Sequence, residues 1–463
     1  MKLLTSSYWS SLSVICTRAL FFLFSLSLTV FLEPKFFGEL AIVLSYLLLI
    51  SSLANFGIES ALISLNKNEI KSYLNTAWTL EFLKGLFVAS IIFFSAEIMS
   101  SFVKKDITSL IELTSIAPLI LALKNIRIAE LRKNLNIKPL FIIELSQVLS
   151  YISFSYIFIY YSAETKSIIY GYIIGCFVYS FFSYFCISYI PKFEFNKIKI
   201  THIFNFSKWY ILSTQISVLL DNSLQILSGR ISSLAYLGNF ERADFISRKS
   251  SGQIGEIFWK FALPAFSNQE NPKKLFLSLN AILILLTFYF SFFVLNYGEH
   301  LIGYLNKDID IKEFLFPLFL ISIMTSFSIM PSILLVSKAR TFYLFIISFV
   351  RLIIISCLVA YFFNELSILL LIKIYTIAII VNIPLAYFFV RKIIKIDIIQ
   401  IIKPALISFL GIFTLSIINY YLNVNIFIHA TLMLIFLVTS ISFFIDDSIK
   451  KIRDLFFKIF KLH

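Results

Sequence analysis

The 463-residue sequence contains few charged residues, and this shortage excludes an ordinary soluble protein. Asp, Glu, Lys and Arg together make up 14% of the residues, whereas hydrophobic residues make up 59%. Soluble domains contain about 25% charged and 45–50% apolar residues. The apolar residues occur in runs of about 20, each long enough for a helix to cross a hydrocarbon core of roughly 30 Å. The sequence therefore predicts a protein made of many membrane-spanning helices.

Motifs for metal, disulfide and nucleotide chemistry are also missing. The cysteines form no C-x-x-C pair, and all lie in apolar runs: Cys16, Cys176, Cys186 and Cys357. The histidines are far apart and have no metal-ligand spacing: His202, His300, His429 and His463. The sequence has neither G-x-x-x-x-G-K-[ST] nor G-x-G-x-x-G, so we expect no cofactor and no hydrolysis of ATP. A cleavable signal is not expected either, because Arg18 interrupts the first apolar run and no A-x-A site follows.

Fourteen apolar runs are candidate spans. Their limits are 8–32, 38–64, 74–100, 107–124, 139–161, 167–190, 208–228, 241–263, 275–297, 314–337, 341–363, 367–390, 404–421 and 425–445. The longest connecting loop, residues 191–207, leaves no room for an extramembrane domain. We therefore expect an all-α integral membrane protein of about 14 transmembrane helices.

The basic residues orient these spans. The net charge is +14, which in a soluble protein would suggest a nucleic-acid partner. Here 25 of the 40 Lys and Arg residues fall on one side of the predicted membrane and 7 on the other. Because basic residues are enriched in cytoplasmic loops, both termini are predicted to be cytoplasmic, and no nucleic-acid partner is expected. Residues 447–463 form a basic tail that is expected to lie on the inner leaflet.

Eight cations lie inside the predicted spans, and these are the strongest functional candidates. A charge facing lipid costs about 2.5–3.5 kcal/mol on insertion scales, so each is expected to face the bundle interior or a watery cavity. They are Arg18, Lys84, Arg242, Arg248, Lys249, Lys260, Arg351 and Lys373. The alternative is a structural ion pair or a snorkelling side chain. Lys84 has Glu81 three residues earlier, so a local pair is equally plausible, and Lys373 lies near a span end.

The eighth span carries a polar stripe. At 100° per residue, Arg242, Lys249, Gln253, Glu256 and Lys260 fall within about 60° of one another. Such a stripe either lines a hydrophilic path or belongs to an amphipathic helix at the membrane surface. The alternation of basic loops favours the path.

Other polar residues concentrate in spans 1, 2 and 7, including Asn55, Glu59 and Asp221. Together with span 8 these are the first two helices of each half, if the chain divides near residue 200. Two halves that meet at a polar seam are a common transporter plan. We therefore predict an N-terminal lobe at 1–200, a C-terminal lobe at 201–395, two additional helices at 396–446 and the tail at 447–463. The internal repeat is weak: Phe37-Gly38 and Leu237-Gly238 begin corresponding spans.

Several segments resemble the Wzx-type flippases of O-antigen and capsule repeat units, within the multidrug/oligosaccharidyl-lipid/polysaccharide exporter superfamily. LEPKFFG at 32–38, followed by NFGIESALI at 55–63, resembles their opening L-x-P-x-x-F-G and G-x-x-x-A-L-I motifs. SGR at 228–230, LGNFERA at 237–243 and PAFSNQ at 264–269 resemble three later motifs. The resemblance covers about residues 5–275. Phe240 stands where the family usually has Tyr, so no role is assigned to that hydroxyl.

This resemblance implies two six-helix lobes plus two helices around a cationic cavity, with alternating access. The implied cargo is an undecaprenyl-diphosphate-linked oligosaccharide, carried across a bacterial inner membrane for O-antigen, capsule or exopolysaccharide synthesis. Expected partners are the polymerase and the chain-length regulator of the same pathway, and the protein is expected to be a monomer. The candidate substrate-binding cations are the eight above and Arg230. Candidate polar residues, including groups for ion coupling, are Asn55, Glu59, Glu81, Asp221, Gln253 and Glu256.

Two other functions fit the sequence less well than a flippase does. A membrane polymerase or ligase of the same pathway would need a sizeable periplasmic loop and paired loop carboxylates, which the sequence lacks. A drug exporter of organic cations would favour acidic residues in the spans, whereas Lys and Arg predominate here. A lipid II flippase or a teichoic-acid exporter of the same superfamily remains open as a close alternative.

Overall fold

The chain folds into helices, and the part that the structure describes contains no strand. The computed structural model describes residues 2–54, 57–59, 62, 69–134, 136–205, 208–267, 272–422, 426–442 and 444. Two compact units divide the chain, Met1–Gly238 (unit 1) and Asn239–His463 (unit 2). The predicted all-α fold is confirmed. The tail 447–463 and Asn55 lie outside the described residues.

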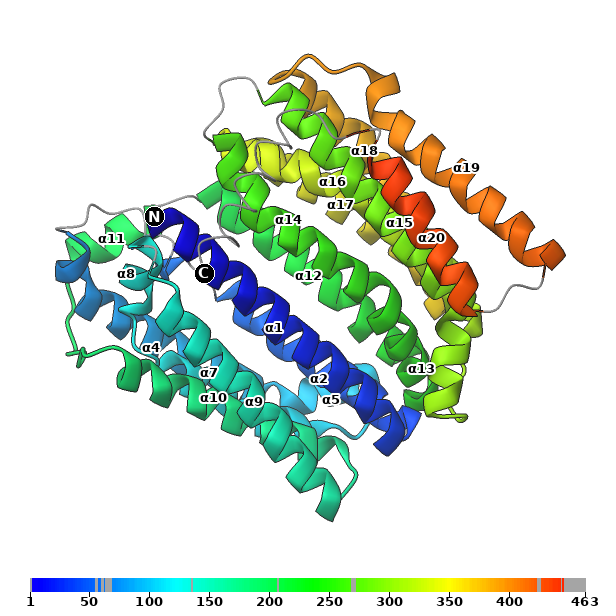
Figure 1. Cartoon of the computed structure of the whole chain (residues 1–463). Helices are drawn as coiled ribbons and strands as arrows, with labels where there is room; N and C mark the ends of the chain where they lie inside the picture. Colours follow the sequence, from blue (N-terminus) through cyan, green and yellow to red (C-terminus); the bar gives the residue numbers. More distant parts are fainter. Residues whose placement is uncertain are drawn as a thin grey trace. The chain divides into compact units, whose positions relative to one another are not determined.

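Among the described residues of unit 1, six helices have 20 or more residues and the others are shorter (Figure 1). In chain order they are α1 (Lys2–Phe31), α2 (Pro34–Leu53), α4 (Ile70–Phe94), α5 (Ala96–Val103), α6 (Thr108–Thr114), α7 (Ile116–Ala122), α8 (Ile128–Lys133), α9 (Lys138–Tyr161), α10 (Thr165–Cys186), α11 (Lys197–Asn205), α12 (Lys208–Ile231) and the start of α13 (Leu234–Asp244).

Unit 2 continues α13 and is built around one long central helix. Its elements are a π-helical turn η1 (Phe245–Lys249), α14 (Ser250–Ser267), α15 (Lys273–Leu305), α16 (Lys312–Ser337), α17 (Thr341–Tyr361), the short 3-10 turn η2 (Phe363–Glu365), α18 (Ile368–Arg391), α19 (Ile398–Leu422) and α20 (Ile426–Ser442).

Each of the fourteen predicted spans coincides at least in part with a helix. Nine helices of the described chain are long and apolar enough to cross a membrane: α2, α4, α9, α10, α15, α16, α17, α18 and the part of α19 at Ile399–Ile417. Three shorter apolar stretches match predicted spans 1, 4 and 14: Cys16–Phe31, Thr108–Ala122 and Ile428–Ser442. The two remaining spans, on α12 and α13–α14, are continuous helix but too polar to meet the same test. The number of crossings and the cytoplasmic termini stay predictions.

Serines break two of the predicted spans into pairs of helices. Span 74–100 divides at Ser95 into α4 and α5, and span 107–124 divides at Ser115 into α6 and α7. Each serine hydroxyl donates a hydrogen bond to a carbonyl of the preceding turn. The Ser95 hydroxyl also forms a hydrogen bond with the Tyr46 hydroxyl, 2.5 Å away. Serine side chains that compete for backbone carbonyls in this way bend helices. In span 38–64, helix α2 ends at Leu53, earlier than predicted.

Small residues allow the closest helix contacts in unit 1. α9 packs along α10, and a Cβ at Gly171 would lie 2.1 Å from the Ser155 hydroxyl. α12 packs along α2, which places predicted span 7 in unit 1. The predicted lobe boundary near residue 200 describes the internal repeat and not the compact units, so it stays a prediction.

The first turns of α2 and α13, which contain Phe37-Gly38 and Leu237-Gly238 of the weak internal repeat, cross each other. A Cβ on Gly38 of α2 would lie 2.1 Å from the carbonyl oxygen of Leu234, and a Cβ on Gly238 of α13 would lie 1.7 Å from that of Pro34. The contact is reciprocal, because each glycine meets the residue four positions before the other. Backbone therefore touches backbone at both points, and only glycine fits.

In unit 2, α15 is the central helix. It packs against α14, α16, α19 and α20, and α18 packs on α16 and α17 (Figure 1). Leu285, Tyr289 and Phe292 of α15 are buried against Leu415 and Met433 of the last two helices.

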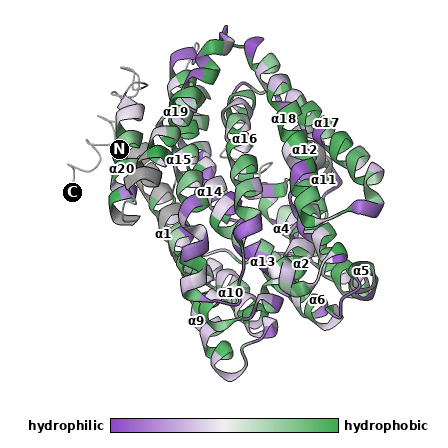
Figure 2. Cartoon of the chain, turned by 90° about the vertical axis from the view of Figure 1, so that its right-hand side faces the viewer, coloured by the Kyte–Doolittle hydropathy of each residue, from purple (hydrophilic) through white to green (hydrophobic). Residues whose placement is uncertain are grey.

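The outer faces of these helices are apolar. Figure 2 shows hydrophobic residues over most of α16, α17, α18 and α19. On α19, Leu406, Phe409, Leu410 and Phe413 are all more than half exposed. Apolar side chains exposed in such numbers mark a surface that faces lipid.

Outside the spans, the loop after α10 is tied to α4. The Lys199 ammonium donates to the Glu194 carboxylate at 2.6 Å and to the Ser72 carbonyl at 2.6 Å. The hydrogen bond from Lys199 lowers the pKa of Glu194 below its usual value.

Candidate functional site

Two clusters of paired charges stand among the predicted site residues, one in each unit. In unit 1, the local pair that the sequence allowed is present: the Lys84 ammonium donates to the buried Glu81 carboxylate at 2.7 Å. Lys124, just after α7, interacts electrostatically with Glu81 and Glu59. Lys84 is thus occupied by a structural partner.

Arg132 joins three helical segments of unit 1. Its guanidinium lies 2.6 Å from the Glu59 carboxylate and 3.7 Å from the Glu144 carboxylate. The Ser13 hydroxyl of α1 donates to the other oxygen of Glu144. These contacts connect α1, α8, α9 and the segment that follows α2.

The unit 1 cluster is electrically balanced. It holds three carboxylates and three cations: Glu59, Glu81, Glu144, Lys84, Lys124 and Arg132. A balanced cluster holds a bundle together but has no excess charge with which to attract an anionic cargo.

The unit 2 cluster is built on the π-helical turn η1. Its defining bond runs from the backbone N–H of Ser250 to the Phe245 carbonyl five residues earlier, and the Ser250 hydroxyl donates to the same carbonyl at 2.6 Å. A π turn takes up one residue more than the 3.6 of an α turn, and such turns occur frequently at functional sites. One turn of each accommodates about eight residues. Lys249 therefore lies over Glu241, eight positions earlier.

Two carboxylates hold two of the cations at this turn. The Lys249 ammonium lies 2.5 Å from Glu241 and 3.8 Å from Asp244. The Arg248 guanidinium donates twice to Asp244, at 2.5 and 2.7 Å. Asp244 is completely buried, so these bonds satisfy a carboxylate that water does not reach.

The same turn interrupts the predicted polar stripe of span 8. Arg242 is 4% exposed, and its guanidinium lies over the Phe245 ring at 5.3 Å. The Lys249 side chain is 38% exposed, Gln253 is half-buried, and Glu256 and Lys260 are exposed. The prediction of one continuous stripe assumed 100° per residue throughout, and the extra residue in η1 breaks that periodicity.

The unit 2 cluster holds more cations than carboxylates. Its three cations and two carboxylates are Arg242, Arg248, Lys249, Glu241 and Asp244. Lys249 is its most accessible cation. An anion that reaches this ammonium competes with Glu241 for it, and a diphosphate offers more acceptor oxygens than a single carboxylate does.

The other predicted site residues lie apart from this turn in sequence. Arg230 ends α12, where it donates to the Phe102 carbonyl at 2.7 Å and stacks on the Phe102 ring at 4.5 Å. Arg18 and Asp221 are exposed on α1 and α12, Arg351 is half-buried on α17, and Lys373 is exposed on α18.

The predicted site residues did not include five members of these clusters: Lys124, Arg132, Glu144, Glu241 and Asp244. A signal existed for Asp244, which stands four residues before Arg248, and for Glu144, an acid inside a predicted span. Arg132 had no such signal, because it lies in a predicted loop and its partner Glu59 is 73 positions away.

Metal and thiol chemistry find no support in the described chain. No group of three His, Cys, Asp or Glu side chains there could hold a metal ion. All four cysteines are free thiols.

A family profile described as polysaccharide biosynthesis protein matches residues 28–305, which is more than half of the chain. No curated protein sequence matches significantly.

Solved structures of several transporters share the fold. The lipid II flippase MurJ, in an inward closed conformation, has a TM-score of 0.68 and 14% identity, over 96% of this chain and 99% of that chain. An inward-facing multidrug resistance MATE family transporter of the MOP superfamily has a TM-score of 0.63 and 14% identity, over 80% of this chain and 93% of that chain.

A MOP superfamily transporter from Pyrococcus furiosus, whose binding pocket is described as having reverse polarity, has a TM-score of 0.56 and 14% identity, over 84% of this chain and 95% of that chain. These likenesses establish a multi-span, all-helical membrane fold.

Proposed function

Because the chain belongs to the family of polysaccharide biosynthesis proteins, we propose that it is a flippase for a lipid-linked oligosaccharide. The cargo would be a repeat unit joined through a diphosphate to undecaprenol. It would cross a bacterial inner membrane by alternating access, for the synthesis of O-antigen, capsule or exopolysaccharide. The pathway's polymerase and chain-length regulator would take the product, and the flippase would act as a monomer.

The observation that carries this proposal is the positive cluster on the π turn. A helix this polar is costly to expose to lipid, so its charges need a polar environment. Lys249 and Arg248 each stand beside a carboxylate, and the cluster holds three cations to two carboxylates. A diphosphate supplies the oxygens that Lys and Arg bind best.

In this proposal, Glu241 and Asp244 hold the cations while cargo is absent. The arriving diphosphate takes over Lys249 first, because Lys249 is the more exposed, and then competes for Arg248. When the diphosphate leaves, the carboxylates take the cations back. The unit 1 cluster, which is balanced, serves mainly to hold its helices together.

The test is a complementation experiment in a strain that lacks this gene. Lys249→Gln should abolish most surface glycan and cause the lipid-linked repeat unit to accumulate, while the protein remains inserted at the normal level. Lys274→Gln, which removes a lysine from the predicted cytoplasmic loop, should complement fully. Normal surface glycan with Lys249→Gln would refute the assignment of this cluster.

The accumulated material separates the alternative functions. A flippase defect leaves lipid-linked single units that a membrane-impermeant periplasmic enzyme cannot reach in intact cells. A polymerase or ligase defect would leave single units that this enzyme does reach. Accumulation of lipid II would identify a lipid II flippase, and unchanged lipid-linked intermediates would favour a drug exporter.

A further inference from the structure

A second cationic site lies at one end of unit 2, where α16 ends, α17 begins and α18 ends. A cavity of about 410 Å³ is lined there by Lys338, Arg340, Tyr343, Lys392 and Ile393. Three of its five lining residues are cations. None of them belongs to the charged cluster on the π turn.

The backbone between α16 and α17 fixes the position of two of these cations. Ala339 has a φ of 54°, in the left-handed region that non-glycine residues rarely adopt. The amide of Arg340 donates to the Leu335 carbonyl at 2.8 Å, and that of Ala339 donates to Val336 at 2.9 Å. The tight reversal sets Lys338 and Arg340 on either side of Ala339.

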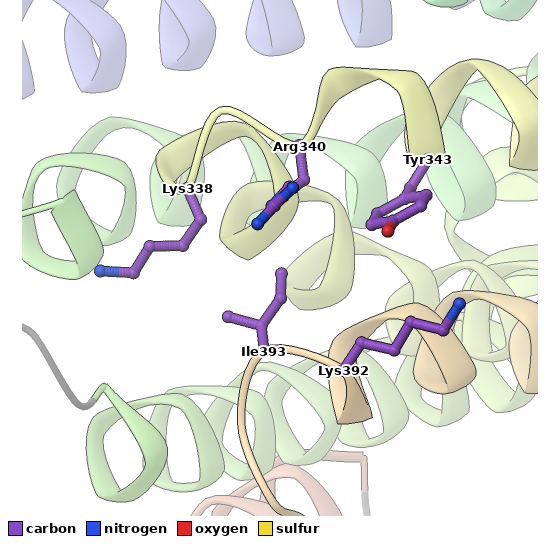
Figure 3. A pocket seen from close by; sticks show the side chains of 5 residues that line it. All are labelled: Lys338, Arg340, Tyr343, Lys392 and Ile393. Atoms are coloured by element: carbon purple, nitrogen blue, oxygen red, sulfur yellow. The ribbon is translucent and has the colours of Figure 1, made fainter.

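The third cation rests on an aromatic platform. The Lys392 ammonium lies 4.7 Å from the Phe388 ring centre, 5.6 Å from Phe389 and 5.7 Å from Tyr343. The Tyr343 and Phe389 rings are themselves stacked, with centres 4.4 Å apart. Figure 3 shows Lys392 directed toward Tyr343, and Arg340 directed toward Ile393.

Two of the three cations, Arg340 and Lys392, can receive an anionic ligand. No salt bridge within the described residues involves Arg340 or Lys392. Both side chains are exposed. A concave site with several cations at helix ends attracts phosphate, which a guanidinium binds through two oxygens at once.

An apolar stripe begins next to this site and follows α17 away from it. Phe342 is 47% exposed, Phe349 is 44% exposed and Ile353 is 45% exposed. Phe345 stacks between Phe342 and Phe349, with ring centres 6.4 and 5.7 Å apart. Only 11% of the apolar window of α17 is buried, the lowest share among the nine candidate spans of the described chain. α17 therefore offers acyl chains a long apolar face.

We propose that this cavity binds the phosphate group of an anionic phospholipid, whose acyl chains lie along the Phe342–Ile353 stripe. Lys338, Arg340 and Lys392 bind the phosphate, and Tyr343 and Ile393 line the apolar side of the site. The predicted topology places these helix ends at the cytoplasmic leaflet, where anionic lipid headgroups attract basic residues. The site is independent of the proposed transport function.

The experiment measures the thermal stability of the purified full-length protein in detergent as lipid is added. The three additions are phosphatidylglycerol, phosphatidylcholine and inorganic phosphate, at equal ionic strength. The test variant is Arg340→Gln/Lys392→Gln. The matched control, Lys395→Gln/Lys403→Gln, removes two exposed lysines that do not line the cavity.

Phosphatidylglycerol should raise the melting temperature of the wild type and of the control, and phosphatidylcholine should not. In the test variant the half-saturating concentration of phosphatidylglycerol should rise roughly 30-fold, since each cation near an anionic lipid is worth about a fivefold change. An equal phosphatidylglycerol response in all three proteins would overturn the proposal. A response to inorganic phosphate as large as that to phosphatidylglycerol would show that the site holds a free anion, and would also overturn it.

A second measurement does not depend on the variant. Raising the salt concentration about tenfold should remove most of the phosphatidylglycerol effect on the wild type, because screening weakens exposed charge pairs. A salt-independent effect would mean that acyl chains alone bind, and the cationic site would then have no part in it.

Discussion

At the scale of single residues, Asp244 is the side chain on which the π-turn cluster depends. It is fully buried and accepts two hydrogen bonds from Arg248, and Lys249 lies 3.8 Å away. Removing one member of a buried pair leaves the other charge without compensation, which costs more than the pair contributes. The acids of this cluster therefore matter for folding, and the proposed binding of cargo by its cations depends on them.

We expect Asp244→Asn to lower the free energy of unfolding by about 2–3 kcal/mol, near the low end for a broken buried pair because Arg248 keeps some contact with water. The measurement is the apparent melting temperature in detergent. Adding Arg248→Gln to Asp244→Asn should recover part of the loss, since the uncompensated cation is then gone. If the double variant is less stable than the sum of the two single changes predicts, the two side chains do not act as a pair.

Sequence spacing predicted the partners only where a regular helix holds them. Glu81 and Lys84, three apart on α4, form the pair that the spacing allowed. Glu59 and Arg132 are 73 positions apart, so their contact depends on how helices pack, which a single sequence does not encode locally. Glu241 and Lys249 lie eight apart and would miss each other on an ideal α-helix, by about 80°.

At the scale of helices, the crossing between α2 and α13 is the closest approach at any described glycine of unit 1. A Cβ at Gly38 or Gly238 would meet a backbone carbonyl, which unlike a flexible side chain has no other rotamer. The predicted topology puts this crossing on the outer side of the membrane. Any conformation that opens that end of the helices must separate Pro34 from Gly238.

Alanine substitutions should therefore have opposite effects at two glycines. Gly238→Ala puts a methyl group 1.7 Å from the Pro34 carbonyl oxygen and should destabilise the protein, because one of the two helices must move. Gly252→Ala on α14 has nothing within 4 Å and should stabilise it by up to about 1 kcal/mol, through helix propensity. Melting temperatures of both variants, measured side by side, test the crossing.

A Gly238→Ala protein as stable as the wild type would mean that this contact is not maintained in solution. If the variant is stable enough to assay, its transport activity gives the second result. A crossing that must open during transport predicts a changed rate for Gly238→Ala and a normal rate for Gly252→Ala.

The helices themselves were largely predictable from the sequence, because apolar runs of membrane length have few alternatives. The breaks at Ser95 and Ser115 and the π turn at Phe245–Lys249 were not. Each depends on a local hydrogen bond to a carbonyl that the hydropathy pattern does not report. Two of the fourteen predicted spans, on α12 and α13–α14, are more polar than the rest, and the alternation of basic loops supports them.

At the scale of the whole molecule, the distribution of basic residues makes a prediction about sidedness. The 25 to 7 bias between alternate loops requires the loop at 162–164 to face the periplasm and the loop at 191–196 to face the cytoplasm. The four native cysteines are free, so they can be replaced by serine before single cysteines are introduced. In intact cells, a membrane-impermeant thiol reagent should label Ser162→Cys and Asp308→Cys. It should label Lys192→Cys and Lys395→Cys only after the membrane is opened.

Labelling of Lys395→Cys in intact cells, with Ser162→Cys labelled as expected, would mean that the number of crossings between these loops is even. In that case one of the polar helices, α12 or α13–α14, would lie along the membrane surface, and the π-turn cluster would lose its place on a transport path.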